Sequence, residues 1–233
     1  MLPLKGRDII VTSGGTREYI DDVRVMTNIS TGKLGANIAQ SLHDLGATVH
    51  YIHGVGAKIP NIEGIHLYQV SSANDLLNSL RGVINSCRKW GSPVFSVIHA
   101  MAVSDFSFKR DSAVKCKSDS AEDFIEYMRR TITKNPKIIS SIKSLEPSTV
   151  LIGFKFEVGA DISTLADLAH KSIEKNHCDL VVTNDKVEMV KKGEHIAHLF
   201  FSDHMHNLGF VDFTVSGKDR IADHIAATLA MLK

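Results

Sequence analysis

The sequence has little cysteine and no long hydrophobic run. Its three cysteines, Cys87, Cys116 and Cys178, are scattered and lack C-x-x-C spacing. This excludes the dense disulfide framework of small secreted proteins and gives no sign of a cysteine-based metal or redox site. No apolar stretch reaches the length of a membrane span, and the N-terminus lacks the pattern of a signal peptide. We therefore expect a cytoplasmic protein without a membrane partner.

The chain also lacks an excess of charge of either sign. Lysine and arginine number 27 and aspartate and glutamate 26, for a net charge of +1. Without an overall basic field, nucleic acid is not an expected partner. With 233 residues and 43% hydrophobic composition, the chain can bury a sizeable core, and we expect one domain over residues 1–233. A small molecule is the favoured partner.

Short apolar runs alternate with amphipathic helical patterns along the chain, which is typical of βα units around a mostly parallel sheet. We predict an α/β, Rossmann-like fold with helices on both sides of the sheet. A polar stretch at 109–119, almost free of large apolar groups, predicts a mobile loop. The predicted strands cover 8–12, 48–52, 94–99, 149–156 and 180–183, and the predicted helices cover 33–45, 72–86, short segments around Phe124 and Ile138, 163–175 and 218–232.

Two apolar segments near the C-terminus, 195–201 and 208–215, flank a polar turn at 204–207. This pattern predicts an antiparallel hairpin at one edge of the sheet. Four histidines lie in or near the hairpin without a cysteine or carboxylate at ligand spacing, so we expect them to face solvent and predict no metal held by the protein itself. They are His195, His198, His204 and His206.

The most informative chemistry follows the first strand. Gly14 and Gly15, in T-S-G-G-T-R-E, remove Cβ where the backbone must turn and approach a ligand. Ser30, Thr31 and Gly32 lie at the start of a helix, whose free N–H groups and dipole favour an anion. Either cluster alone is also explained by a tight turn or a helix cap. Both together, at the carboxyl end of a strand in an open α/β sheet, favour a phosphate site.

This phosphate site leaves more than one ligand class open. The glycine spacing is not G-x-G-x-x-G, and the second strand ends in Y-I-H-G at 51–54, without the acidic residue that would bind a ribose. A P-loop is not met either, because Leu34 follows Lys33 where that motif has a hydroxyl residue. A mononucleotide triphosphate therefore fits better than a dinucleotide. An NAD(P)-dependent oxidoreductase of Rossmann type stays as the alternative enzyme, and a non-catalytic nucleotide sensor as a third reading.

Three segments, TSGGTRE, DDVRVMTNISTGKLGANIA and AMAVSDF, resemble phosphopantothenate-cysteine ligase (phosphopantothenoylcysteine synthetase) of coenzyme A biosynthesis. The resemblance covers nearly the whole chain. It implies a ligase that activates 4'-phosphopantothenate through an acyl-nucleotide, an acyl-CMP if the co-substrate is CTP rather than ATP, and releases pyrophosphate before L-cysteine reacts. Mg²⁺ is expected with the nucleotide phosphates. Because the chain begins at the ligase's own first strand, we expect the stand-alone bacterial form.

The resemblance also implies residues that bind the acyl substrate. Asn28, in the N-x-S-[ST]-G-[KR] pattern, would contact the pantothenate acyl group and help the intermediate react with cysteine. Met101, Ala102 and Asp105 fall on the A-A-V-[AS]-D element, which lines the substrate site. Met101 departs from the usual alanine. Because the aspartate of this element reaches across a dimer interface in the family, the resemblance implies a homodimer with shared active sites.

The nucleotide site implied by the resemblance draws on residues along most of the chain. Lys115 would swing over the triphosphate and is expected to be catalytic, with Lys117 as the alternative because Ser118 replaces the last lysine of the K-x-K-K motif. Lys171 and Lys175 lie one helical turn apart and would face one polyanion or base edge. The expected nucleotide-binding residues are Gly14, Gly15, Ser30, Gly32, Gly35, Lys115, Thr133, Lys134, Asn135, Pro136, Phe154, Lys171, Lys175 and Asn184.

Overall fold

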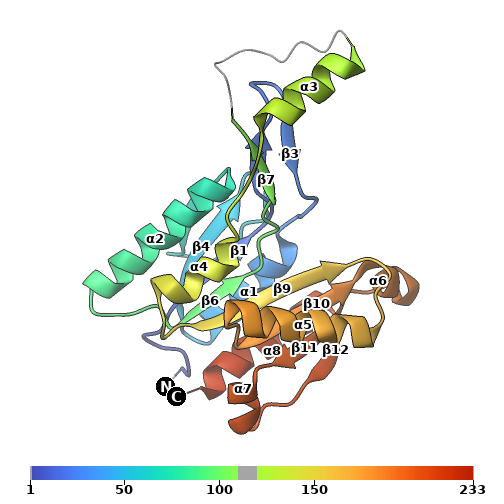
Figure 1. Ribbon diagram of the computed structural model, residues 1–233. Helices are drawn as coiled ribbons and strands as arrows, with labels where there is room; N and C mark the ends of the chain where they lie inside the picture. The colour runs from blue at the N-terminus through green and yellow to red at the C-terminus, as the bar shows by residue number, and fades with distance from the viewer. Residues whose placement is uncertain (1, 110–119, 233) are drawn as a thin grey trace.

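A computed structural model of the protein describes residues 2–109 and 120–232 (Figure 1). Within that part of the chain, the core is an eight-stranded sheet in the order β12-β11-β10-β9-β6-β1-β4-β5. The strands from β10 to β5 run parallel, and β11 is antiparallel to both of its neighbours. This confirms the predicted mostly parallel fold. The strands are β1 Asp8–Ser13, β4 Thr48–Gly54, β5 His66–Val70, β6 Ser96–His99, β9 Val150–Glu157, β10 Leu180–Asp185, β11 Ile196–Phe201 and β12 Phe213–Ser216.

Helices cover both faces of this sheet. Ile9 and Val11 of β1 belong to the apolar cluster under α1 and α8, whereas Ile10 belongs to the cluster under α2, α4 and α5. All three side chains are fully buried. A strand covered on both faces is apolar throughout, which is why β1 reads as a continuous hydrophobic run. The helices are α1 Lys33–Asp44, α2 Ala73–Lys89, α4 Ile138–Leu145, α5 Ile162–Asn176 and α8 Lys218–Met231.

Local sequence signals set the starts of these helices. The Ser72 side chain accepts a hydrogen bond from the Asp75 N–H, and the Asp75 carboxylate accepts one from the Ser72 N–H, so the two residues form a capping box at the start of α2. α1 begins after Gly32, whose φ of 70° lies in the left-handed region. The helices predicted at 33–45 and 72–86 are confirmed to within a few residues.

The predicted edge hairpin is present as the antiparallel pair of β11 and β12. A short helix, α7 (Asp203–Asn207), replaces the predicted polar turn, because Ser202 caps it by accepting from the Met205 N–H. His198 is buried, with its ring nitrogens 2.8 Å from a Glu188 carboxylate oxygen and 2.8 Å from Thr214 Oγ1. The expectation that this histidine faces solvent is therefore wrong. Glu188 belongs to α6 (Lys186–Lys192), a helix that the sequence pattern did not predict.

Five further elements form an arm that projects beyond the sheet (Figure 1). Two antiparallel pairs, β2 with β3 and β7 with β8, carry α3 at their outer end, and Tyr127 Oη of α3 donates to the Ile20 carbonyl at 2.8 Å. The helix predicted around Phe124 is α3. The four strands were not predicted, because three residues are too few to show an alternating pattern. The arm comprises β2 Arg17–Tyr19, β3 Val25–Thr27, β7 Phe106–Phe108, α3 Ala121–Thr131 and β8 Ile132–Lys134.

The predicted loop at 109–119 lies, apart from Lys109, outside the described residues. Among the described helices, none combines the length and the apolar character needed to cross a bilayer.

Candidate active site

The loops that follow β1 and β6 meet at the carboxyl edge of the sheet. The Ala102 N–H donates to the Gly14 carbonyl at 2.8 Å, and the Thr16 N–H donates to the Ala102 carbonyl at 3.2 Å. Gly15 and Ala102 thereby form a short parallel bridge beyond the ends of their strands. Two motifs that are far apart in the sequence, the glycine loop and the AMAVSDF segment, are joined by backbone hydrogen bonds.

The third strand at this edge, β4, closes against the glycine loop. A Cβ at Gly54, the last residue of β4, would lie 2.1 Å from the Gly15 carbonyl oxygen, which no real side chain tolerates. Gly54 therefore permits a backbone-to-backbone approach. In the sequence, Gly54 counts only as evidence against a dinucleotide, because β4 does not end in an acidic residue. Its packing against Gly15 is visible only in the structure.

The start of α1 is fixed to the end of β1. Ser13 Oγ donates to the Gly32 carbonyl at 3.0 Å, and a Cβ at Gly35 would lie 2.3 Å from Ser13 Oγ. No side chain caps α1, although the Lys33 N–H lies 3.4 Å from Thr31 Oγ1. The first-turn N–H groups and the positive end of the helix dipole therefore lie beside the glycine loop, an arrangement that favours an anion.

Asn28 lies on the segment that leads from the arm to α1. Its Nδ2 donates to the Val103 carbonyl at 3.2 Å, so the predicted acyl-binding amide contacts the loop after β6. Thr27 Oγ1 donates to the Thr16 carbonyl at 2.7 Å and fixes the same segment to the glycine loop. Asn28 is nevertheless exposed. The amide is thus held in place while its surface stays open to a substrate.

The T-K-N-P segment contacts the other side of the AMAVSDF loop. The Asn135 N–H donates to the Asp105 carbonyl at 2.8 Å, and Asn135 Nδ2 donates to the Ser104 carbonyl at 2.9 Å. Lys137 Nζ lies 2.5 Å from Asp105 Oδ1 in an exposed ion pair. Asn135 and Asp105 are therefore neighbours, as their predicted roles in one site require.

The side chain of Met101 points away from this surface. It is buried in the apolar cluster under α2, so only its backbone is available at the edge. Ala102 is partly exposed. The methionine that replaces the alanine of the family pattern is accommodated by the core.

Glu18 is a buried acid next to the candidate site that the sequence analysis did not single out. Its carboxylate is buried beneath the edge and accepts a hydrogen bond from the Ala73 N–H at 2.7 Å. Burial raises its pKa, and hydrogen bonds from Ala73, Thr16 and Asn135 oppose that rise. Glu18 is the last residue of the T-S-G-G-T-R-E motif. An acidic residue so near the two glycines was the sequence signal that could have identified it.

The remaining predicted residues are more dispersed. Phe154 packs against the α1 and α8 cluster, and the buried Asn184 donates to the Ile196 carbonyl. Lys171 and Lys175 are exposed on the second half of α5. This helix runs from the carboxyl edge back toward the amino edge, so the two lysines lie away from the glycine loop of their own chain. Lys115 and Lys117 fall outside the described residues.

The fold and this edge define a Rossmann-like α/β domain with a glycine loop and a helix start beside a second loop, which carries Asp105. The family described as the DNA/pantothenate metabolism flavoprotein C-terminal domain matches residues 4–232. The chain belongs to this family.

Relatives and solved structures agree with this assignment. The coenzyme A biosynthesis bifunctional protein CoaBC of Thermococcus kodakarensis is 35% identical over 181 residues, which are 78% of this chain and 42% of that protein. CoaBC of Bacillus subtilis is 31% identical over 184 residues, 78% of this chain and 41% of that protein. The chain thus spans less than half the length of these curated relatives.

The crystal structure of the DNA/pantothenate metabolism flavoprotein from Streptococcus pneumoniae has a TM-score of 0.76 and 29% identity, and the match covers 96% of this chain and 97% of that one. A Cab2 variant in complex with phosphopantothenate-cysteine has a TM-score of 0.68 at 16% identity, covering 97% of this chain and 87% of that one, and shares the fold. The oxidoreductase alternative is not favoured.

Replacing Gly54 by Ala tests the close approach of β4 to the glycine loop. The added Cβ collides with the Gly15 carbonyl, so we expect a loss of roughly 2 kcal/mol or more in the free energy of unfolding, measured by urea denaturation. Gly82→Ala is the matched control, because a Cβ there meets no atom within 4 Å and alanine favours its helix by about 0.5–1 kcal/mol. Equal stability of the two variants would contradict the packing described.

His99 lies beneath the junction of the glycine loop with Ala102, and its burial makes the stability of the folded protein depend on pH. Its Nδ1 is 2.9 Å from Thr12 Oγ1, which accepts from the Met101 N–H, and burial lowers the pKa of His99 to about 4. The unfolded chain, with a histidine pKa near 6.5, therefore binds the proton more readily, and stability falls as the pH drops below that value.

Between pH 6.5 and pH 5, the free energy of unfolding should fall by roughly 1–2 kcal/mol more in the native protein than in His99→Gln, which cannot titrate. Denaturant titrations of both proteins at the two pH values measure the difference. Parallel pH profiles would show that His99 is not held neutral.

Proposed function

We propose that the chain is a phosphopantothenate-cysteine ligase, a cytoplasmic enzyme of coenzyme A biosynthesis. The observation that carries the proposal is the junction of the glycine loop, the start of α1 and the Asn28 and Asp105 loops at one sheet edge. Membership of a family named for pantothenate metabolism, and relatives named for coenzyme A biosynthesis, support it. A structural neighbour bound to phosphopantothenate-cysteine supports the choice of substrates.

The proposed reaction has two steps. A carboxylate oxygen of 4'-phosphopantothenate attacks the α-phosphorus of CTP, forming an acyl-CMP and releasing pyrophosphate. The amine of L-cysteine then attacks the acyl carbon, forming the amide and releasing CMP, and the ammonium proton leaves to solvent. A carboxylate is a poor electrophile, and its conversion to a mixed anhydride is what makes the second step possible.

The triphosphate would lie along the glycine loop. Backbone N–H groups around Gly14 and Gly15 and the first turn of α1 offer donors and a positive dipole end without bulk. Lys115, outside the described residues, would add charge at the α-phosphate. ATP is the alternative co-substrate. The other predicted nucleotide-binding residues would select between the cytosine and the adenine base.

Mg²⁺ would accompany the nucleotide. The carboxylates of Glu18 and Asp105 at the candidate site already have partners: Glu18 accepts from the Ala73 N–H, and Asp105 pairs with Lys137. The cation is therefore expected on the phosphate oxygens rather than in a cage of protein ligands, as is usual for Mg²⁺ with nucleotides. When bound, it neutralises phosphate charge.

Asn28 and Asp105 would hold the acyl substrate. An uncharged amide such as that of Asn28 donates to a developing oxyanion without titrating. Asp105 would accept from the pantothenate hydroxyl or amide, for which its exposure leaves room. Because Asn28 is tied to the Val103 carbonyl, both side chains are positioned by the same loop.

Replacing Asn28 by Asp tests the reaction and the role together. In mixtures of CTP, 4'-phosphopantothenate, cysteine and Mg²⁺, the native protein should release pyrophosphate and form phosphopantothenoylcysteine. The variant should still release pyrophosphate in the first turnover but form product about 10²-fold more slowly, since a donor to the oxyanion is lost. Quenched-flow analysis measures both products.

Asn78→Asp is the matched control, because Asn78 is exposed on α2; it should behave as the native protein does. Product formation at the native rate by Asn28→Asp would remove the proposed role. No pyrophosphate release by the native protein with either CTP or ATP would remove the proposed function, and competition between the two nucleotides identifies the co-substrate.

The proposed active form is a homodimer built through the arm. The arm and its β2–β3 turn expose apolar side chains that a lone chain leaves in water: Val23 66%, Ile125 54%, Phe106 45% and Ile132 43%. Large apolar side chains that gather on an exposed element are typical of association surfaces. Because β7 begins directly after Asp105, a partner docked on the arm would lie beside the substrate site, which agrees with shared active sites.

Ile125→Asp should weaken the dimer at least tenfold, because a charge would be buried against apolar groups, and should lower ligase activity in parallel. Sedimentation equilibrium gives the dissociation constant. Val190→Asp, at an equally apolar residue that is 74% exposed on α6, should leave assembly unchanged. A native protein that stays monomeric at all concentrations, or an Ile125→Asp dimer of native affinity, would contradict this assembly.

A further inference from the structure

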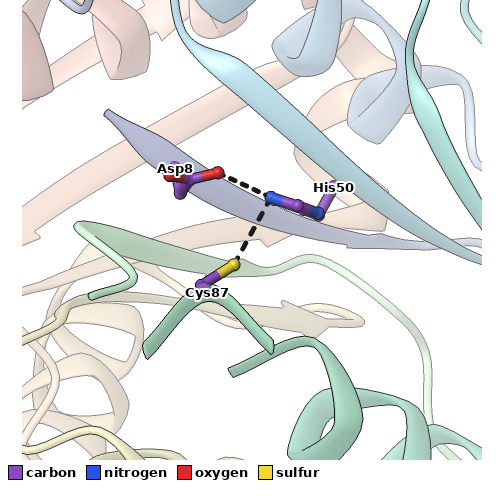
Figure 2. Close-up of side chains that lie close together, drawn as sticks. All are labelled: Asp8, His50 and Cys87. Carbon is purple, nitrogen blue, oxygen red and sulfur yellow. Dashed lines mark hydrogen bonds and ion pairs between the residues drawn. The ribbon is translucent and has the colours of Figure 1, made fainter. Parts of the chain in front are cut away.

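A cluster of three potential metal ligands lies at the amino edge of the sheet, opposite the candidate active site. Asp8 is the first residue of β1, His50 lies in β4, and Cys87 lies near the end of α2. Figure 2 shows the imidazole between the carboxylate and the thiol. His50 and Cys87 are almost fully buried, and the Asp8 side chain is 17% exposed.

Both neighbours approach the same ring nitrogen. His50 Nε2 is 2.8 Å from Asp8 Oδ1 and 3.5 Å from Cys87 Sγ. In a nucleophilic triad, the acid and the thiol would contact different nitrogens of the ring, so that the acid orients the base. Convergence on one nitrogen is not that arrangement. Instead, three potential ligand atoms, Asp8 Oδ1, His50 Nε2 and Cys87 Sγ, lie together where β1, β4 and α2 meet.

The spacing suits a small cation. The three ligand atoms all lie within 4.8 Å of one another. Around a tetrahedral Zn²⁺, with Zn–S near 2.3 Å and Zn–N or Zn–O near 2.0–2.1 Å, ligand atoms are separated by about 3.3–3.7 Å. His50 Nε2 and Asp8 Oδ1 lie closer than this, at 2.8 Å, so metal binding would require side-chain rotations that separate these two atoms and place all three around the cation, with the fourth position left for water.

The charge balance supports the same conclusion. A divalent cation held by one thiolate, one carboxylate and one neutral imidazole forms a site of zero net charge, which a buried position tolerates.

The surroundings orient the ligands. Ser92 Oγ donates to the other carboxylate oxygen of Asp8 at 2.5 Å, and His50 Nδ1 lies 3.4 Å from the Tyr68 hydroxyl. With Nε2 on a metal, the ring carries its proton on Nδ1 and donates to that hydroxyl, the kind of partner that metal-bound histidines use. The His66 ring stacks on His50, with centroids 4.8 Å apart.

We propose that Asp8, His50 and Cys87 form a binding site for a thiophilic divalent cation, Zn²⁺ in preference to Mg²⁺. Binding breaks the Cys87 S–H bond, forms a sulfur–metal bond and releases one proton to solvent. Thiolate and imidazole are ligands that Zn²⁺ favours and Mg²⁺ does not. The site would join β1, β4 and α2 at the amino edge of the sheet. The glycine loop and the predicted acyl-binding residues lie at the opposite edge, so the role of the metal would be structural.

Cobalt titration of the full chain, first stripped of metal with a chelator, tests the site. Co²⁺ should produce a thiolate-to-metal charge-transfer band in the near ultraviolet that saturates at one ion per chain. An indicator dye should report about one proton released per ion, and Zn²⁺ should bleach the band. Thermal unfolding should shift to higher temperature with Zn²⁺ but not with an equal concentration of Mg²⁺.

Three variants and two controls assign the ligands. Cys87→Ala should lose the band, and Asp8→Asn should bind Co²⁺ at least tenfold more weakly. Ser92→Ala, which removes only the hydrogen bond to Asp8, should weaken binding about 10–100-fold. Cys178→Ala, at another buried free cysteine, and His66→Gln should keep the native spectrum.

A native protein without the band, a Cys87→Ala variant that keeps it, or a band lost only with Cys178 would overturn the proposal. Circular dichroism of each variant separates loss of binding from loss of folding. If Cys87→Ala does not fold, the Asp8→Asn and Ser92→Ala affinities and the proton release decide the outcome. None of these readouts depends on ligase activity.

Discussion

The backbone junction between the glycine loop and Ala102 is the contact on which the candidate site depends. The Ala102 N–H and carbonyl bond to Gly14 and Thr16 just beyond the ends of β1 and β6. Asn28 is held through Val103 and Asn135 through Ser104, on the loop that continues from this junction. The relative positions of the proposed phosphate and acyl sites are thus set by main-chain hydrogen bonds at the junction together with the side-chain amides of Asn28 and Asn135.

Much of the fold and part of the site could be predicted from the sequence. The buried strand β1 is a continuous apolar run, and the amphipathic helices α1 and α2 have strong helical periodicity. The glycine loop could be predicted as a ligand site because ligands of a parallel sheet bind at the carboxyl ends of its strands. The four strands of the arm were missed, since strands of three residues are too short to show a periodic pattern. His198 was misplaced because its partner Glu188 belongs to a helix that was not predicted, and such pairing is visible only in three dimensions.

The sequence also could not show which residues far apart along the chain lie close together in the fold. Asp8, His50 and Cys87 show no ligand spacing along the chain, yet strand register and the path of α2 bring them together. The same holds for Gly54, whose role appears only when β4 closes on Gly15. The two edges of the sheet are consequently different in character: one exposes backbone donors and polar loops, whereas the other buries a compact set of ligand atoms.

The central claim, that this glycine edge binds the nucleotide, is tested most directly by nuclear magnetic resonance of the ¹⁵N-labelled protein during titration with CTP and Mg²⁺. We predict that the amide signals of Gly14, Gly15 and Gly32 shift together and saturate, while those of Asp8 and Cys87 at the opposite edge stay in place. Shifts confined to the opposite edge, or unchanged glycine signals at saturating CTP, would contradict it.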